Sequence, residues 1–283
     1  MTTLSLLSVA ARAPRGSTTR FAPAPTGFLH LGHVANALLV WGIARGCGGR
    51  VLLRIEDHDS TRCKPEYESA ILEDLDWLGF APDTMVPRQS SRTERYEQAL
   101  AALDAVALVY PCACSRRDIS REVPDVFGEE MRYPGRCRTR SVAPDATLAR
   151  RVRMDDGVET FTDALLGPQR QSPAGQCGDL LVRDTRGLWT YQFAVTVDDM
   201  DQGIDLVIRG EDLLDSTGRQ LRLARLLGRT TPPQFLHHPL LRNADGSKLS
   251  KSAGDTAVRE LRAGGHGADE VRALAARLAG IQL

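Results

Sequence analysis

The chain has 283 residues, and its 36 basic and 36 acidic side chains give a formal net charge of zero at pH 7. A neutral chain is no bulk binder of polyanions, so any nucleic acid that it binds must meet a local basic patch. Hydrophobic residues make up 42% of the sequence. No apolar run approaches the roughly 18–20 residues of a membrane span, which predicts a soluble globular protein without a membrane partner.

Residues 1–19 are rich in Ser and Thr and contain no acidic residue. This composition is faintly like a transit peptide, but the whole chain is rich in Ala and Arg, so we expect a disordered leader here. Six cysteines are too few for a disulfide framework, and nothing indicates an oxidising compartment, so we expect a cytoplasmic protein.

The segment 20–33 predicts a strand, a turn and the start of a helix. Its prolines and Gly27 exclude a simple strand or helix. Apolar residues spaced by three and four then predict a helix to about Ala44. A turn that brings backbone N–H groups and the imidazoles of His30 and His33 to a helix start suits polyphosphate. Each histidine alone could equally be a packed or a surface residue.

A second candidate for phosphate binding lies far downstream. Lys248 and Lys251 stand three residues apart in a segment rich in Gly and Ser. Two such ammonium groups on a loop suit the β- and γ-phosphates of a nucleotide. The two segments together predict a nucleotide site.

Two strands and two helices indicate a doubly wound α/β sheet. Residues 49–56 are apolar on both faces, which predicts a central parallel strand. The strand ends at Glu56, whose carboxylate could pair with a ligand ammonium or could merely cap the next helix. Residues 65–80 and 92–106 predict crossover helices, and residues 235–241 predict a last buried strand.

Two arginines on predicted strands point to an acidic ligand. Arg20 lies on the first strand, and Arg209 lies near the end of another over 205–212. A guanidinium group can bind a carboxylate through two hydrogen bonds. Two of them converging on one pocket favour a ligand with two carboxylates. The next predicted helix, 217–227, carries arginines at a spacing of three, which indicates an exposed face.

A cysteine cluster marks an insert that begins at residue 109. Cys112 and Cys114 form a Cys-x-Cys pair, and Cys137 supplies a third thiol. A tetrahedral zinc site needs about four ligands, and no histidine lies between residues 59 and 236 to complete it. Such a site would be structural, because it would clip a long irregular insert.

The insert is also locally basic. Residues 115–153 contain ten arginines and six acidic residues. This excess suits contact with RNA, and it equally suits a solvated face. The arginines are Arg116, Arg117, Arg121, Arg132, Arg136, Arg138, Arg140, Arg150, Arg151 and Arg153.

His30-Leu-Gly-His33 resembles the HIGH motif of the class I aminoacyl-tRNA synthetases, and Lys248-Leu-Ser-Lys251-Ser252 resembles their KMSKS loop. A longer match is similar to the glutamyl subgroup and covers residues 20–27, 53–57 and 207–212. The motifs run in order over most of the chain. Ala24 is a departure, because it stands where the subgroup usually has Ser.

The resemblance implies a Rossmann-like doubly wound parallel sheet with a zinc-clipped insert. Residues 20–108 and 188–252 would form the two halves of the catalytic domain, and residues 109–187 the insert. A short helical C-terminus would cover residues 253–283, with helices at 256–263 and 268–279, and no anticodon-binding domain is expected.

The resemblance also implies roles for single residues. Catalysis would depend on His30, His33, Lys248 and Lys251. ATP, accompanied by Mg²⁺, would be bound by His30, Gly32, His33 and Lys251. The glutamate pocket would be formed by Arg20, Ala22, Ala24, Glu56, Tyr191 and Arg209. Structural Zn²⁺ would be held by Cys112, Cys114, Tyr133 and Cys137. Both tyrosines could instead be packed aromatic residues, and Tyr191 lies in a segment, 188–195, that alternates with small residues.

The Cys-x-Cys and Tyr-x-x-x-Cys pattern is similar to that of short glutamyl-synthetase paralogues, the glutamyl-queuosine tRNA(Asp) synthetases. This resemblance implies activation of L-glutamate by ATP and transfer to queuosine in the anticodon stem-loop of tRNA-Asp, by a monomer. Two alternatives stay open. One is a free-standing activator that passes glutamate to a small molecule or a carrier protein, and the other is a non-catalytic RNA-binding paralogue.

Overall fold

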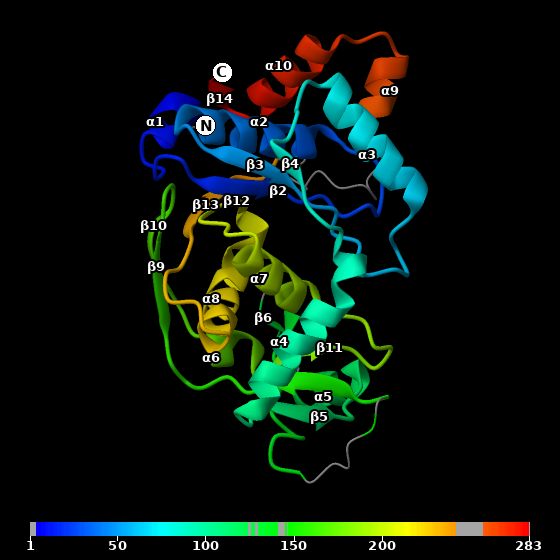
Figure 1. Ribbon diagram of the computed structural model, residues 1–283, viewed down its shortest axis with the longest axis vertical. Helices are drawn as coiled ribbons and strands as arrows, with labels where there is room; N and C mark the ends of the chain where they lie inside the picture. The colour runs from blue at the N-terminus through cyan, green and yellow to red at the C-terminus, as the bar shows by residue number, and fades with distance from the viewer. Residues whose placement is uncertain are drawn as a thin grey trace.

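The computed structural model describes residues 4–123, 126–127, 130–140, 145, 147–241 and 257–282. A parallel sheet crosses the upper half of the molecule, with α1, α2 and α10 above it and α7 and α8 below it (Figure 1). The lower half carries a second, antiparallel sheet with α4 and α5 beside it.

Parallel strands form the centre of the fold and confirm the predicted α/β architecture. Side by side they are β4 (Thr84–Met85), β3 (Arg50–Leu53), β2 (Thr18–Phe21), β12 (Leu206–Gly210) and β13 (Gln234–His238). The Asp205 N–H joins β12 to β2 by donating to Thr18 O at 3.1 Å. Three of the four residues of β3 are buried, as expected for a central strand that is covered on both faces.

A hairpin extends this sheet beyond β13. Its strands, β9 (Glu159–Asp163) and β10 (Gly167–Gln171), are antiparallel, and β9 meets β13 where Asp163 lies opposite Phe235. We expected residues 109–187 to form a separate insert. Residues 159–171 instead belong to the central sheet, because their partner strand is supplied by the second half of the domain.

Helix α2 (Leu31–Gly46) lies on one face of the parallel sheet and is buried almost all round. This burial follows from its neighbours, since α1 (Leu6–Ala10) and α10 (Ala268–Ala279) pack on its other side. A helix that is apolar on all faces needs such double cover. The contact is close at Gly46, where an added Cβ would lie 2.6 Å from the Cβ of Ala10.

The expected disorder of residues 1–19 is corrected for the described part of that segment. β1 (Leu4–Ser5) pairs in parallel with β14 (Ile281–Gln282). Val9 and Ala10 on α1 are buried in the main core, so the apolar residues of this stretch have a packing surface in α2.

The predicted helices 65–80 and 92–106 are α3 (Pro65–Trp77) and α4 (Thr93–Ala105), and the helices after residue 256 are α9 (Val258–Ala263) and α10. Helix α7 (Tyr191–Asp201) begins within the alternating segment 188–195. Two 3-10 turns, η1 (Gln89–Arg92) and η2 (Glu211–Ser216), follow strand ends.

The antiparallel sheet of the insert has the order β11 (Leu180–Arg183), β8 (Ala149–Val152) and β5 (Val109–Cys112). Short helices α5 (Arg116–Glu122) and α6 (Pro173–Cys177) and the small hairpin of β6 (Val126–Phe127) and β7 (Glu130–Met131) complete it.

The predicted helix 217–227 is α8 (Thr217–Leu226), but its arginines do not form an exposed face. Arg219 and Arg222 are buried, and Arg222 pairs with the buried Glu159 of β9. Only Arg225 extends into solvent. Among the described residues, no helix combines the length and the apolar character that crossing a membrane requires.

Candidate functional site

A cavity of about 390 Å³ lies at the carboxyl ends of the parallel strands, which is where open α/β sheets bind ligands. Eight of the residues expected at the site line it: Arg20, Ala22, His30, Gly32, His33, Glu56, Tyr191 and Arg209. Ala24 is not among the lining residues. Lys248 and Lys251 lie outside the described residues. The described residues on either side of them are close to the cavity: Leu241 lines it, and Ala257 forms a bridge with His30.

The two histidines lie at the N-terminus of α2. His30 is the N-cap, and its Nδ1 accepts the Gly32 N–H at 3.1 Å. The Nδ1 of His33 accepts the His30 N–H at 3.1 Å. Because both Nδ1 atoms are acceptors, a neutral ring carries its proton on Nε2. The turn therefore combines two Nε2–H donors with the positive end of a helix, which suits phosphate oxygens.

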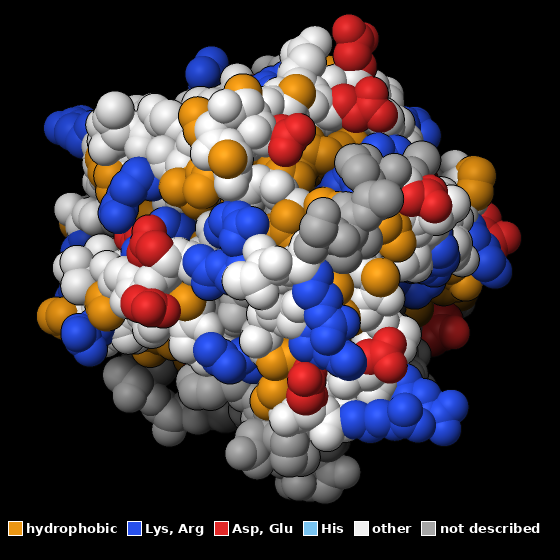
Figure 2. Space-filling model, turned by 90° about the horizontal axis from the view of Figure 1, so that it is seen from below, with side chains coloured by type: hydrophobic (Ala, Val, Ile, Leu, Met, Phe, Trp, Pro, Cys, Tyr) orange, Lys and Arg blue, Asp and Glu red, His pale blue; other side chains and the backbone are white. Residues whose placement is uncertain are grey.

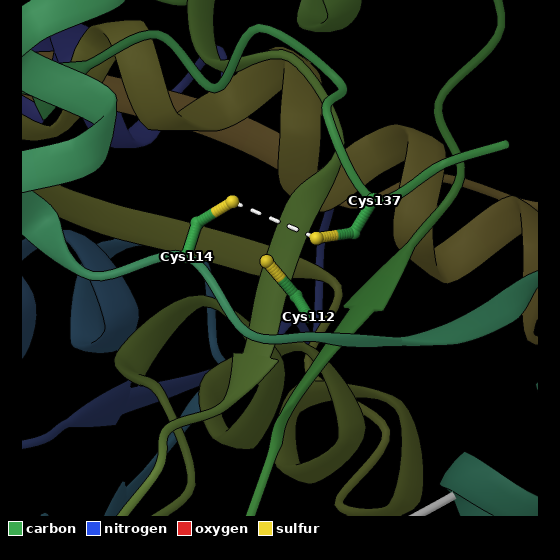
Figure 3. A group of neighbouring side chains, drawn as sticks. All are labelled: Cys112, Cys114 and Cys137. Carbon is green, nitrogen blue, oxygen red and sulfur yellow. Dashed lines mark hydrogen bonds between the residues drawn. The ribbon is translucent and has the colours of Figure 1, made fainter. Parts of the chain in front are cut away.

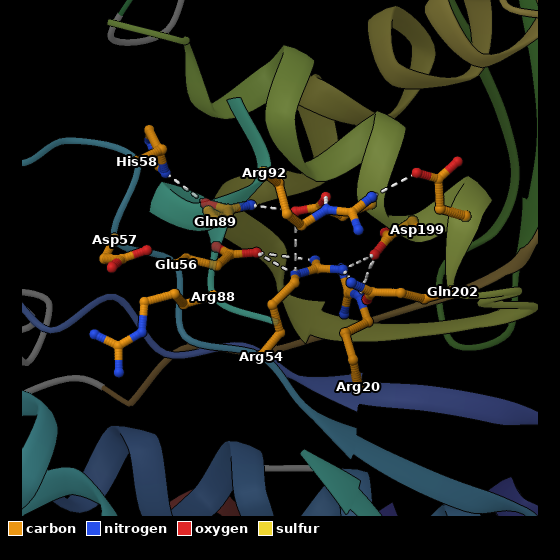
Figure 4. Close-up of polar contacts among 12 residues, drawn as sticks. Arg20, Arg54, Glu56, Asp57, His58, Arg88, Gln89, Arg92, Asp199 and Gln202 are labelled. Carbon is orange, nitrogen blue, oxygen red and sulfur yellow. Dashed lines mark hydrogen bonds and ion pairs between the residues drawn. The ribbon is translucent and has the colours of Figure 1, made fainter. Parts of the chain in front are cut away.

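Arg54 is the centre of a buried charge network beside the cavity (Figure 4). Its side chain is fully buried and donates to Glu56 Oε1 at 2.9 Å and to Asp199 Oδ1 at 2.8 Å. Burial opposes the charge of Arg54, but Asp199, Glu56 and Asp198 outweigh this effect and raise its pKa. The network fixes Glu56 and Asp199 where β3 meets α7.

The same network holds Arg20. The Nε of Arg20 donates to Asp199 Oδ1 at 3.1 Å, so one carboxylate on α7 bridges the arginines of β2 and β3. Arg92 reinforces the arrangement by donating to Asp198 Oδ1 at 2.7 Å. Each buried charge in this group has a partner, which is the condition under which buried ion pairs are tolerated.

Glu56 is suited to a cationic ligand group. Arg54 bonds to Oε1, and Oε2 makes no hydrogen bond to the described residues. Burial raises the pKa of Glu56 in spite of the attraction of Arg54. An ammonium group in the cavity would favour the ionised form and complete its hydrogen bonds.

Arg209, at the end of β12, is buried and is hydrogen-bonded to Tyr191 and to four further groups. Its Nε donates to His237 Nε2 at 3.0 Å, and its Nη1 donates to Gln220 Oε1 at 2.7 Å. Its Nη2 donates to Thr217 Oγ1 at 2.8 Å and to Leu213 O at 3.3 Å. These partners hold the guanidinium group in the lining of the cavity, to which Arg20 also belongs.

The three predicted thiol ligands also come together, in the insert. The sulfur atoms of Cys112, Cys114 and Cys137 lie within 4.8 Å of one another, and Figure 3 shows that the three side chains converge. Cys114 Sγ is 3.6 Å from Cys137 Sγ. Zinc–sulfur bonds of about 2.3 Å in a tetrahedron place two sulfurs about 3.8 Å apart. The cluster therefore fits a metal of this kind.

Tyr133 completes the cluster. Its Oη is 3.4 Å from Cys112 Sγ and 3.9 Å from Cys114 Sγ, and it accepts the Cys137 N–H at 2.8 Å. Gly178 lets the chain approach Tyr133 from behind: it has φ of +67°, and an added Cβ would lie 2.1 Å from Tyr133 O. The phenol oxygen thus lies within 4 Å of two of the three sulfur atoms.

Arg151 belongs to this cluster and not to an RNA-facing surface. It is buried, its Nε donates to Cys112 Sγ at 3.3 Å, and its guanidinium group stacks on the Tyr133 ring at 3.7 Å. A cation at this position favours the thiolate that a metal requires. The other described arginines of 115–153 are exposed or half-buried. Seen from the end that carries the insert, the basic side chains of the described residues lie among acidic ones (Figure 2).

Comparison with known proteins identifies the family. Residues 17–278 match the family model described as tRNA synthetases class I (E and Q), catalytic domain. The chain belongs to this family. It is a ligase of the class I aminoacyl-tRNA synthetase type, and this assignment confirms the resemblance drawn from the sequence motifs.

Curated relatives are similar over most of the chain. It is 45% identical over 244 residues to the glutamyl-Q tRNA(Asp) synthetase of Cupriavidus metallidurans, covering 84% of this chain and 78% of the relative. The glutamyl-Q tRNA(Asp) synthetase of Nitratidesulfovibrio vulgaris is 40% identical over 279 residues, covering 93% and 86%. These relatives place the chain among synthetases of that name.

Solved synthetases share the fold. A glutamate tRNA ligase from Elizabethkingia meningosepticum, solved with its amino acid, superposes with a TM-score of 0.72 at 30% identity. The match covers 85% of this chain and 53% of the ligase, so the chain spans about half the length of that structure. A methionyl-tRNA synthetase from Mycobacterium tuberculosis, with a TM-score of 0.58 at 14% identity, shares the fold.

The sequence motifs did not reveal the partners of the cavity arginines. Arg54 lies only two residues before Glu56, and two adjacent acids, Asp198 and Asp199, interrupt an apolar helix. A buried carboxylate requires a cation, so this interruption was the available signal. Asp163 and His237 carried no such signal, because neither lies in a charged pattern.

Proposed function

We propose that this ligase activates L-glutamate with ATP and transfers the glutamyl group to queuosine in the anticodon stem-loop of tRNA-Asp. The observation that carries the first step is the composition of one cavity, in which Arg20, Arg209 and Glu56 share a wall with the histidine turn. The second step is supported by the names of the curated relatives.

The ligand groups match the charges of the cavity. The ammonium group of glutamate pairs with Glu56, whose Oε2 faces no other described donor. Its two carboxylates are matched by Arg20 and Arg209. Arg209 has no carboxylate partner among the described residues. A glutamine side chain opposite Arg209 would leave this buried charge uncompensated, so the site discriminates against it.

Activation needs no general base. The glutamate α-carboxylate is ionised at neutral pH, and it attacks the α-phosphorus of ATP as pyrophosphate leaves. His30 and His33 donate from Nε2 to the phosphate oxygens, and the N-terminus of α2 adds its positive end. Mg²⁺ accompanies ATP and neutralises part of the phosphate charge. Lys248 and Lys251 contribute cations from the loop. Catalysis is thus positioning and charge stabilisation.

Zn²⁺ fits the cluster of Cys112, Cys114, Tyr133 and Cys137, where it would connect β5 to the chain that follows α5. The cluster lies in the insert, and its residues do not line the cavity. We therefore propose a structural role for it.

Labelled glutamate and two tRNA-Asp preparations test the proposal, one with queuosine and one with guanosine at that position. We expect label only on the queuosine form, in the fragment that contains the anticodon loop. Arg209→Met, which removes a carboxylate partner, should abolish labelling, whereas the exposed control Arg277→Met should not. Label at the 3′ end would refute the acceptor, and pyrophosphate exchange without any tRNA labelling would indicate a small-molecule or carrier-protein acceptor.

A further inference from the structure

Arg209 is a buried cation whose hydrogen-bond partners are all neutral. Among the described residues they are an imidazole, an amide, the hydroxyls of Thr217 and Tyr191, and a main-chain carbonyl. Arg20 on the same cavity is instead paired with the carboxylate of Asp199. The described part of the chain therefore leaves the charge of Arg209 without an ion-pair partner, at the wall of a cavity.

The imidazole that accepts from Arg209 is held in one tautomer by a buried carboxylate. His237 Nδ1 lies 2.7 Å from Asp163 Oδ2, and both side chains have an exposed fraction of 0%. A carboxylate can only accept, so Nδ1 carries the proton and Nε2 offers its lone pair to the Nε–H of Arg209. Burial, together with the nearby charges of Arg209 and Arg20, lowers the pKa of His237 in spite of Asp163.

Asp163 is itself fixed from both sides. Its Oδ1 accepts the N–H groups of Leu165 and Leu166, both at 2.9 Å, and its Oδ2 also accepts the His237 N–H at 3.0 Å. These bonds and His237 outweigh burial and lower the pKa of Asp163. An ionised Asp163 on β9, a neutral His237 on β13 and Arg209 on β12 thus form one chain of hydrogen bonds across three neighbouring strands.

We propose that Asp163 and His237 are positioning residues that aim Arg209 at the bound amino acid and leave its charge available to a substrate carboxylate. A neutral acceptor such as His237 can orient the guanidinium group and leave its positive charge uncompensated. A carboxylate in the same place would orient the group but would also neutralise its charge before substrate bound. The inference rests on the proposed function, in which the substrate is glutamate.

The test is glutamate-dependent exchange of pyrophosphate into ATP by the full chain, with KM determined separately for glutamate and for ATP. His237→Leu removes the acceptor, and Asp163→Asn presents an amide that favours the wrong tautomer. Each should raise the KM for glutamate roughly tenfold to a hundredfold, the effect of a lost hydrogen bond to a charged group. The KM for ATP should stay the same. His237→Gln keeps an acceptor and should recover most of the affinity.

Exposed residues supply matched controls: His266→Gln and Asp76→Asn should leave both constants unchanged. Asp163 also binds three main-chain N–H groups, so Asp163→Asn can fail to fold. The two His237 variants then decide the question, with thermal unfolding used to confirm that they are folded.

The pH profile separates positioning from a merely structural role. The charged or titratable groups near His237 are Asp163, Arg209, Arg20 and the adjacent His238. Because His237 must be neutral, the wild-type kcat/KM for glutamate should fall only below the ordinary histidine pKa of about 6.5. In His237→Gln, the kcat/KM for glutamate should not show this fall at low pH. Equal changes in both KM values, or none, would overturn the proposal. A wild-type chain without glutamate-dependent exchange would instead overturn the proposed function, and this inference with it.

Discussion

At the scale of single residues, Arg54 matters most for holding the site together. Its fully buried guanidinium group pairs with Glu56 and Asp199 and lies 3.8 Å from Asp198. Arg54→Met would leave these carboxylates buried without their main cation. Breaking a buried pair in this way costs about 3–5 kcal/mol, so we expect the free energy of unfolding in urea to fall by that amount.

Arg88, in an exposed ion pair, provides the matched control for Arg54→Met. Arg88 pairs with Glu68 at 2.6 Å, but its side chain is 51% exposed, so Arg88→Met should cost less than about 1 kcal/mol. Arg54→Lys keeps the charge but not the planar fork, and it should fall between the two. Equal losses for Arg54→Met and Arg88→Met would show that the buried network does not stabilise the fold.

Residue-level prediction succeeded where a side chain is tied to a strand end. Arg20, Glu56 and Arg209 were placed by the strands that carry them, and the structure brings them to one cavity. Their partners were missed because the contacts are distant in sequence: Arg54 and Asp199 are 145 residues apart. No local pattern encodes a contact of that kind.

At the scale of elements, the insert depends on its cysteine cluster. Cys137→Ser removes a ligand, so the purified variant should contain little zinc by elemental analysis, and a chelator should not lower its unfolding temperature further. Tyr133→Phe should bind zinc more weakly than the wild type, because only the phenol oxygen is lost. Cys47→Ser is the control, since Cys47 is buried at the C-terminal end of α2 and is not part of the cluster.

Two results would contradict a zinc site with Tyr133 as a ligand. Wild-type protein that is purified without metal and gains no stability from added zinc would show that the four residues are a packed cluster and not a metal site. Full zinc content in Tyr133→Phe would mean that the cysteines and a water suffice.

Element boundaries were predictable where periodicity is local. The strand 49–56 and the helices 65–80 and 92–106 follow from their own apolar spacing, and the structure has β3, α3 and α4 there. One assignment failed. We assigned residues 159–171 to the insert, but they form a hairpin of the central sheet. Its strand β9 pairs with β13, about 70 residues later in the chain, as the Asp163–His237 contact shows.

At the scale of the whole molecule, both described ends of the chain meet on the outer face of α2. α1 and α10 pack against it, and β1 pairs with β14. This is the helix whose N-terminus carries His30 and His33, so the packing of the terminal elements against α2 bears on how the two imidazoles are held. On the proposed function, a loss of packing against α2 should therefore weaken ATP binding more than glutamate binding. Glutamate binding depends instead on Arg54 and Arg209.

Ala275 tests this dependence, because it is fully buried on α10 within the main core. Ala275→Asp would place an unpaired carboxylate in that contact, which costs several kcal/mol unless the helix detaches. We expect a lower free energy of unfolding in urea and, in the folded fraction, a higher KM for ATP with an unchanged KM for glutamate. The control Ala102→Asp introduces the same charge on an exposed face of α4 and should change neither constant. If Ala275→Asp raised the KM for glutamate alone, the terminal helix would not support the histidine turn, and its packing would matter only for stability.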